Sequence, residues 1–216
     1  MNPLLRGSNA RMDLRVCRAD ISAVDTSRVE NYKETGATRM NRTEIEIKLN
    51  QERAWTLVTW AAMPPDDLTR GITTSKHDPE ASWSAKDHLA HLAGIEAAFN
   101  GIIRRYIAGD PNPIGIMKNP DGSTPSREEV MTRVHAMNEA WVRKHRNKSF
   151  SEVVALGQKI RGETLALLAE LSDEQLAERL PGAPWADGTI GGVMAVNGDH
   201  ARQHHGWVTR GLSAQQ

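Results

Sequence analysis

The last helical pattern of the chain contains the stretch His200-Ala201-Arg202-Gln203-His204-His205. His200 and His204 are four residues apart, so on an α-helix their side chains lie one turn apart on the same face. A helix offers two imidazoles to one metal ion in this way. Two ligands are only part of a four-coordinate site, so the chain must supply a third from elsewhere.

Two candidates for the third ligand lie upstream, in Trp83-Ser-Ala-Lys-Asp-His-Leu-Ala-His-Leu-Ala-Gly-Ile-Glu96. Helical periodicity does not choose between His88 and His91, and His88 lies closer to the middle of the apolar stripe. Three neutral nitrogen ligands would leave an open coordination position, which is typical of a catalytic site. The competing interpretation is that these histidines are ordinary polar groups of a helical core, bonded to water or to carbonyl oxygens.

Apolar residues recur at helical spacing in four or five long segments. The composition is rich in Ala, Leu, Glu, Arg and Met, which favours helices and leaves little or no sheet. The predicted helices span about 43–62, 84–109, 126–146, 153–171 and 189–210, with a short capped turn at 172–176. The fold class is therefore predicted to be all-α, as a helical bundle whose core can host a metal site.

The chain divides into three parts. Residues 1–39 are polar and show no sustained period, so we predict a poorly ordered N-terminal extension. Residues 40–212 form the predicted bundle domain, and residues 213–216 form a short tail. Within the domain, the segment 109–125 is rich in Pro, Gly and Asn, and such a long connection is typical of a crossover, a lid or a binding loop.

The charge balance is even, with 27 Lys and Arg against 27 Asp and Glu. No overall field attracts anions, so we predict neither a nucleic-acid partner nor a membrane surface. No apolar run approaches the ~18 residues of a membrane span. The N-terminus has no apolar core typical of a secretory signal. Cys17 is the only cysteine, which excludes an internal disulfide, and we expect a cytoplasmic protein.

Three more residues are candidates for supporting roles. Asp87 lies one turn before His91 and can orient that ring or simply cap the helix. Asn197 lies three residues before His200 and can bond a substrate, and Trp185 can line a pocket. No catalytic acid or base is identified. Four other polar residues are predicted to lie outside the site, namely Glu96, which is not a predicted ligand, and His77, His135 and His145, which are predicted surface residues.

Two segments together resemble the DinB/YfiT-like superfamily of metalloenzymes. Residues 83–96 are similar to its signature on helix two, which begins Trp-Ser or Trp-Thr, continues with an acidic residue and ends Leu-x-His-Leu. Residues 189–206 are similar to its final helix, which opens Thr-x-Gly and carries His-x-x-x-His. The resemblance covers roughly residues 40–212 and implies that His91, His200 and His204 are the metal ligands.

The same resemblance implies a fold and a chemistry. The fold is a four-helix bundle in up-down-down-up order, with a long crossover between helices two and three where segment 109–125 lies. Related members include thiol S-transferases. We therefore expect a divalent metal, zinc or nickel, as the cofactor, with thiol S-transfer or hydrolysis of a small molecule as the chemistry. A low-molecular-weight thiol and a homodimer are further expectations.

An alternative function comes from a narrower resemblance. Residues 137–141, 171–176 and 184–185 are similar to the ClbS/DfsB branch. That branch implies a stress-response protein that binds or detoxifies a small molecule without a metal, or without catalysis.

Overall fold

The structure is a computed structural model, and it describes residues 40–74, 82–115, 119 and 121–215. The predictions for residues 1–39, including Cys17, and for His77 lie outside these residues. The described elements are α2 (Arg42–Ala61), α3 (Pro65–Thr69), β1 (Gly71–Thr74), β2 (Ser82–Ser84), α4 (Ala85–Ile107), α5 (Arg127–His145), α6 (Phe150–Glu170), α7 (Asp173–Ala177) and α8 (Ile190–Ser213). The predicted all-α class is confirmed.

Short polar residues determine where the helices begin. At the start of α4, the Ser84 side chain accepts a hydrogen bond from the Asp87 backbone, and the Asp87 side chain accepts one from the Ser84 backbone. The same reciprocal capping box opens four other helices, with Asn41, Ser126, Ser149 and Ser172 as the N-cap residues. Thr189 caps α8 through the backbone amide of Gly192. Each box satisfies amides that a helix terminus leaves without partners.

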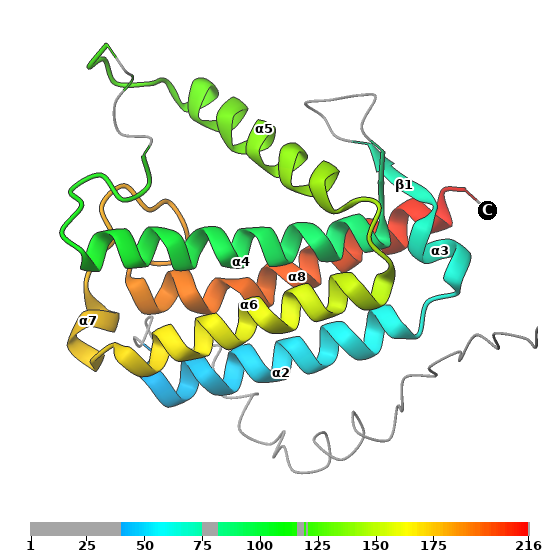
Figure 1. Cartoon of the computed structure of the whole chain (residues 1–216), viewed down its shortest axis with the longest axis horizontal. Helices are drawn as coiled ribbons and strands as arrows, with labels where there is room; N and C mark the ends of the chain where they lie inside the picture. Colours follow the sequence, from blue (N-terminus) through cyan, green and yellow to red (C-terminus); the bar gives the residue numbers. More distant parts are fainter. Residues whose placement is uncertain (1–39, 75–81, 116–118, 120, 216) are drawn as a thin grey trace, which may run out of the picture. The chain divides into compact units, whose positions relative to one another are not determined.

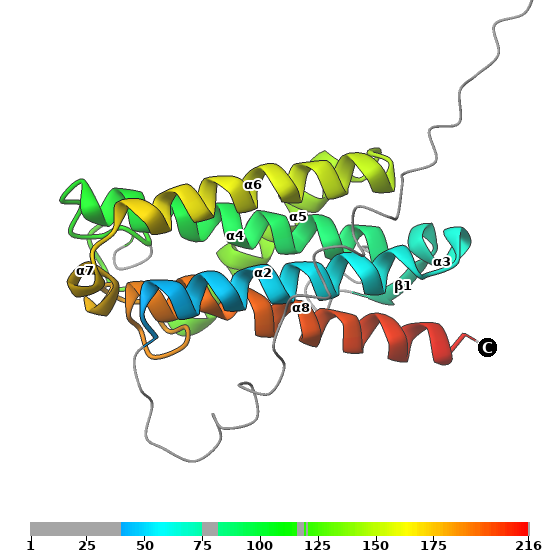
Figure 2. The ribbon, with the colours of Figure 1, turned by 90° about the horizontal axis from the view of Figure 1, so that it is seen from below.

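Four long helices lie side by side (Figures 1 and 2). Helix α4 packs on α6 and α8, and α2 packs on α8 and α6. In Figure 1, α2 and α8 run toward the marked C-terminus, while α4 and α6 run the opposite way. Helix α5 packs on α4 and crosses above it at an angle.

Within the part of the chain that the structure describes, the buried apolar residues form two clusters. One contains Ile45, Leu49, Phe99, Leu167 and Met194 among its buried members. The other cluster includes the buried residues Trp60, Leu89, Val154 and Val208. The two sets lie toward opposite ends of the same four helices. Between them, the helices carry buried polar residues, namely His91, Glu96, Asn100, Arg161, Thr164, Asn197 and His204.

A short antiparallel hairpin lies against the end of this bundle. Strand β1 pairs with β2, with Thr73 opposite Trp83. The hairpin approaches α8 so closely that a Cβ atom at Gly211 would collide with the carbonyl oxygen of Ile72. Glycine at this position therefore allows the two backbones to meet.

The structure differs from the predicted pattern in helix α5. Met137 is spaced three residues from Val134 and four from Trp141, as on one helical face, yet its side chain is 64% exposed. Of the other long helices, only α4 packs extensively against α5 among the described residues. Helix α5 therefore buries a narrower face than a central helix does. Helix α6 begins at Phe150 rather than near Val153, because Ser149 caps it.

Candidate metal centre

The structure brings His91, His200 and His204 together. One ring nitrogen of each lies within 4.8 Å of the others. His91 comes from α4 and the other two from successive turns of α8, two helices that pack on each other. His91 and His204 are buried, and His200 is half-buried.

The donor set fits one small metal ion. The Nε2 atoms of His200 and His204 are 3.0 Å apart. Two nitrogens bound at about 2.05 Å to a tetrahedral zinc ion lie about 3.3 Å apart, so a small adjustment of the rings would suffice. The His91 ring lies 4.8 Å from the His204 ring and 5.5 Å from the His200 ring, measured between centroids.

Burial keeps these imidazoles neutral. It lowers the pKa of His91 to about 3, with further lowering by the charges of His200, His88 and His135. The pKa values of His200 and His204 are also lowered, in both cases chiefly by burial. A metal ligand must offer a nitrogen lone pair, so neutral rings are in the state that binds.

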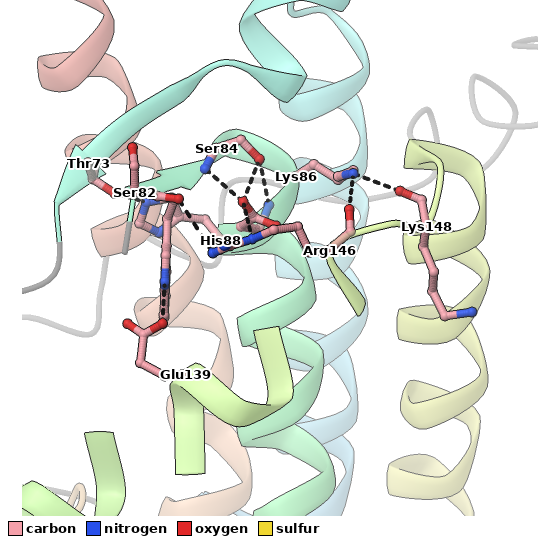
Figure 3. A network of polar contacts seen from close by, with 10 residues as sticks. Thr73, Ser82, Ser84, Lys86, His88, Glu139, Arg146 and Lys148 are labelled. Carbon is pink, nitrogen blue, oxygen red and sulfur yellow. Dashed lines mark hydrogen bonds and ion pairs between the residues drawn. The ribbon is translucent and has the colours of Figure 1, made fainter. Parts of the chain in front are cut away.

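His88 is a fourth histidine of the cluster. It was one of the two sequence candidates for the third ligand, before the family resemblance favoured His91. The Nδ1 atom of His88 lies 2.7 Å from Nδ1 of His204. The Nε2 atom of His88 lies 2.7 Å from Oγ1 of Thr73 (Figure 3). Burial lowers the pKa of His88 to about 4, helped by the charge of His200. Its central position on the apolar stripe was the signal in the sequence. Its partners could not be read there, because Thr73 comes from the hairpin.

Two tryptophans flank the histidines. The Trp83 ring lies 5.1 Å from the His91 ring, and the Trp207 ring lies 4.5 Å from the His204 ring. Nε1 of Trp83 donates a hydrogen bond to the Glu139 carboxylate of α5 (Figure 3). Helix α5 thereby holds one wall of the site in place.

Asp87 acts in the structure as a helix cap. Its Oδ2 atom accepts hydrogen bonds from the backbone and the hydroxyl of Ser84. Its Oδ1 atom is buried with no hydrogen bond among the described residues. The orienting role toward His91 therefore remains a prediction.

The other two predicted site residues, Trp185 and Asn197, have partners of their own, and their roles at the site remain predictions. Trp185 packs on Phe99, whose position on α4 is eight residues beyond His91, or about 12 Å along the helix. Asn197 lines a small cavity of about 20 Å³ together with Glu96 and Arg161. Glu96 was not predicted as a ligand, and its carboxylate instead pairs with Arg161 at 2.6 Å.

Two histidines that were predicted to lie on the surface do not fit that description. His145 is only 7% exposed, and its ring packs on Trp141 at 4.5 Å. His135 is half-buried and close enough to His91 to lower the pKa of that residue. Both belong to α5, whose packing against α4 could not be read from a weak apolar pattern.

Comparison with known proteins identifies the family. The sequence model described as the DinB superfamily matches residues 48–208. No curated protein matches this chain in sequence. Among the described residues, no helix has the length and apolar character needed to cross a membrane.

Three solved structures share the fold. An uncharacterised protein from Escherichia coli UTI89 has a TM-score of 0.53 at 15% identity, covering 81% of this chain and 94% of its own. A protein from Streptococcus pneumoniae has a TM-score of 0.55 at 14% identity, covering 81% and 91%. The colibactin self-resistance protein ClbS, in complex with a dsDNA, has a TM-score of 0.56 at 13% identity, covering 83% and 98%.

The prediction that nucleic acid is excluded as a partner is wrong, because ClbS has this fold and its structure contains dsDNA. The physical reason is that net charge averages over the whole surface. Residues 143–148 read Arg-Lys-His-Arg-Asn-Lys, and within this run Arg143, Lys144 and Arg146 are exposed. A neutral chain can thus carry a locally basic surface.

Proposed function

This chain belongs to the DinB superfamily, and on that premise we propose that it is a metal-dependent enzyme acting on a small molecule. His91, His200 and His204 would hold one divalent metal ion, zinc or nickel. The observation that carries the proposal is the convergence of three neutral imidazoles from two helices within 4.8 Å. Imidazole ligands suit both metals.

The chemistry would come from the open coordination position that three protein ligands leave. A bound divalent metal supplies Lewis-acid chemistry. Around it, burial keeps the three rings unprotonated, while Trp83 and Trp207 shield two of them from water. We propose thiol S-transfer or hydrolysis as the reaction, with a low-molecular-weight thiol as the cosubstrate in the first case.

The family also bears on the topology. We infer a four-helix bundle of α2, α4, α6 and α8 in up-down-down-up order. This inference is supported by the opposite directions of the α2/α8 and α4/α6 pairs. The crossover between the second and third helices would then run from 108 to 149 and contain α5, so it is longer than the loop 109–125. A homodimer is part of the proposal as well.

The test is metal analysis of protein purified without a histidine tag. We expect about one zinc or nickel ion per chain, lost when His91, His200 and His204 are all replaced by Ala. His205→Ala is the matched control, because its ring packs on Trp55 and Trp60 instead of on the trio. Metal content that is unchanged in the triple variant would reject the proposal.

A second candidate function is metal-independent small-molecule binding or detoxification of the ClbS type, with contact to nucleic acid. The shared fold and the exposed basic run at residues 143–148 favour it. Phosphate contacts by Lys and Arg make such binding weaken steeply as salt rises.

Fluorescence anisotropy with a labelled DNA duplex at two salt concentrations tests this candidate. Replacing Arg143, Lys144 and Arg146 by Gln should abolish binding. The control variant removes three other exposed or half-exposed charges, with Lys48, Arg104 and Lys159 replaced by Ala. Equal loss in both variants would indicate a general charge effect, and DNA binding that survives in the first variant would exclude the basic run.

A further inference from the structure

A continuous line of hydrogen-bonding atoms leads from the candidate metal centre to the hairpin. Nε2 of His200 faces Nε2 of His204 at 3.0 Å, and Nδ1 of His204 faces Nδ1 of His88 at 2.7 Å. Nε2 of His88 then lies 2.7 Å from the hydroxyl oxygen of Thr73 (Figure 3). His88 and His204 are each only 2% exposed, so water does not compete for these contacts.

Each contact needs one donor and one acceptor. A neutral imidazole carries one N–H and one lone pair, so its two nitrogens have opposite roles. The hydrogen bonds from His200 through His204 and His88 to Thr73 must therefore all be donated in the same sense. Without metal, donation from the His200 end toward Thr73 and donation from Thr73 toward the His200 end both satisfy every atom. The proton between His204 and His88 belongs to His204 in one direction and to His88 in the other.

Metal binding would permit only one of these directions. The Nε2 atom of His204 faces His200, so it is the nitrogen that would ligate the metal and must keep its lone pair. The proton of His204 then lies on Nδ1 and is donated to Nδ1 of His88. The proton of His88 consequently lies on Nε2 and is donated to Thr73.

We propose that His88 and Thr73 are positioning residues that fix the orientation and tautomer of His204 as a metal ligand. This inference rests on the proposed function. Metal-bound histidines usually donate their other N–H to a nearby acceptor, and here the acceptor is a second imidazole. The acceptor ring itself packs against two tryptophan rings, that of Trp83 at 5.3 Å and that of Trp207 at 6.5 Å between centroids.

The geometry argues against His88 as a fourth ligand. Its Nδ1 atom contacts the nitrogen of His204 that does not face His200. The separation of 2.7 Å is also shorter than the roughly 3.3 Å expected for two nitrogens on one tetrahedral metal. A direct hydrogen bond accounts for this distance.

Zinc affinity of three full-length variants tests the proposal, measured by competition with a chromophoric chelator. His88→Leu removes the acceptor and should weaken zinc binding roughly 10–100-fold. His88→Asn keeps an acceptor near the position of Nδ1 and should weaken it less than about tenfold. Thr73→Val leaves His88 in place without its own acceptor, and its effect should lie between those of the other two.

Long-range ¹H–¹⁵N NMR of the zinc-loaded parent protein provides a second readout that packing alone would not produce. His204 should carry its proton on Nδ1 and His88 on Nε2. This measurement needs no variant, so it remains decisive if His88→Leu does not fold.

The outcomes distinguish the proposed metal-dependent function from the proposed positioning role of His88 and Thr73. If the parent chain binds no stoichiometric zinc or nickel, the proposed function and this inference both fall. If the parent binds zinc and His88→Leu binds it equally well, or if His204 carries its proton on Nε2, only the inference falls. Equal weakening by Leu and Asn would show that His88 acts through packing, and would also overturn it.

Discussion

At the scale of single residues, the buried histidines link stability to pH. Burial lowers the pKa of His88 to about 4 and of His91 to about 3, against an ordinary value near 6.5 in the unfolded chain. Between these values the unfolded chain binds protons that the native metal-free protein does not. The free energy of unfolding should therefore fall as the pH drops below about 6.5, by about 1.4 kcal/mol per pH unit for each group.

Urea unfolding of the metal-free protein at pH 7.5, 6.5, 5.5 and 4.5 measures this loss. Carboxylates also titrate at the acid end, so the informative quantity is the difference between proteins. The double variant His88→Asn, His91→Gln lacks both groups and should show a shallower decline than the parent. Parallel curves would mean that these two rings titrate normally in the native state.

At the scale of elements, the docking of α5 depends on one glycine of α4. The Trp141 ring of α5 would lie 2.7 Å from a Cβ atom at Gly94, and Nε1 of Trp141 donates to the carbonyl of Ala90 at 2.8 Å. Gly94→Ala should therefore displace Trp141 and loosen α5, while raising the intrinsic helix propensity of α4 by up to ~1 kcal/mol.

Hydrogen exchange resolved by segment distinguishes these effects. In Gly94→Ala, the amides of α5 should exchange faster while those of α6 stay protected. Gly101→Ala is the matched control on the same helix, because a Cβ atom there meets only the end of Arg105 at 3.7 Å. Unchanged exchange in α5 would show that the Trp141 contact does not hold this helix.

Most helix starts could be predicted from the sequence because their causes are local, and the exception is α6, whose Ser149 cap was not recognised. Ser84, Ser126 and Ser172 each precede an acidic or amide residue three positions later, and each caps a helix in the structure. The partner of His88 could not be predicted, because it lies on a strand whose position depends on tertiary packing. The burial of His145 was missed for the same reason, since it depends on where α5 docks.

At the scale of the whole molecule, a polar layer separates two apolar clusters. Its centre is the Arg161–Glu96 pair, in which Glu96 also accepts a hydrogen bond from Thr164 at 2.7 Å. Both side chains are almost fully buried, at 10% and 7% exposed. Removing one partner leaves a buried charge, so Arg161→Met should lower the free energy of unfolding by about 3–5 kcal/mol.

Replacing both partners removes the charge itself. The double variant Glu96→Leu, Arg161→Met should recover most of the lost stability, because paired apolar side chains need no solvation. Urea unfolding of the parent, the single variant and the double variant measures this. A double variant that is no more stable than Arg161→Met would show that Glu96 is satisfied without Arg161.

Gly211 has an effect that reaches beyond its own neighbourhood. It lies seven residues after His204, about two turns along α8. Any larger residue there would meet the carbonyl of Ile72 and push the hairpin away, and Thr73 is the very next residue of that strand. A missense change at Gly211 would thus impair the histidine cluster from a distance. A survey of sequence variants that considered only the histidines would overlook this position.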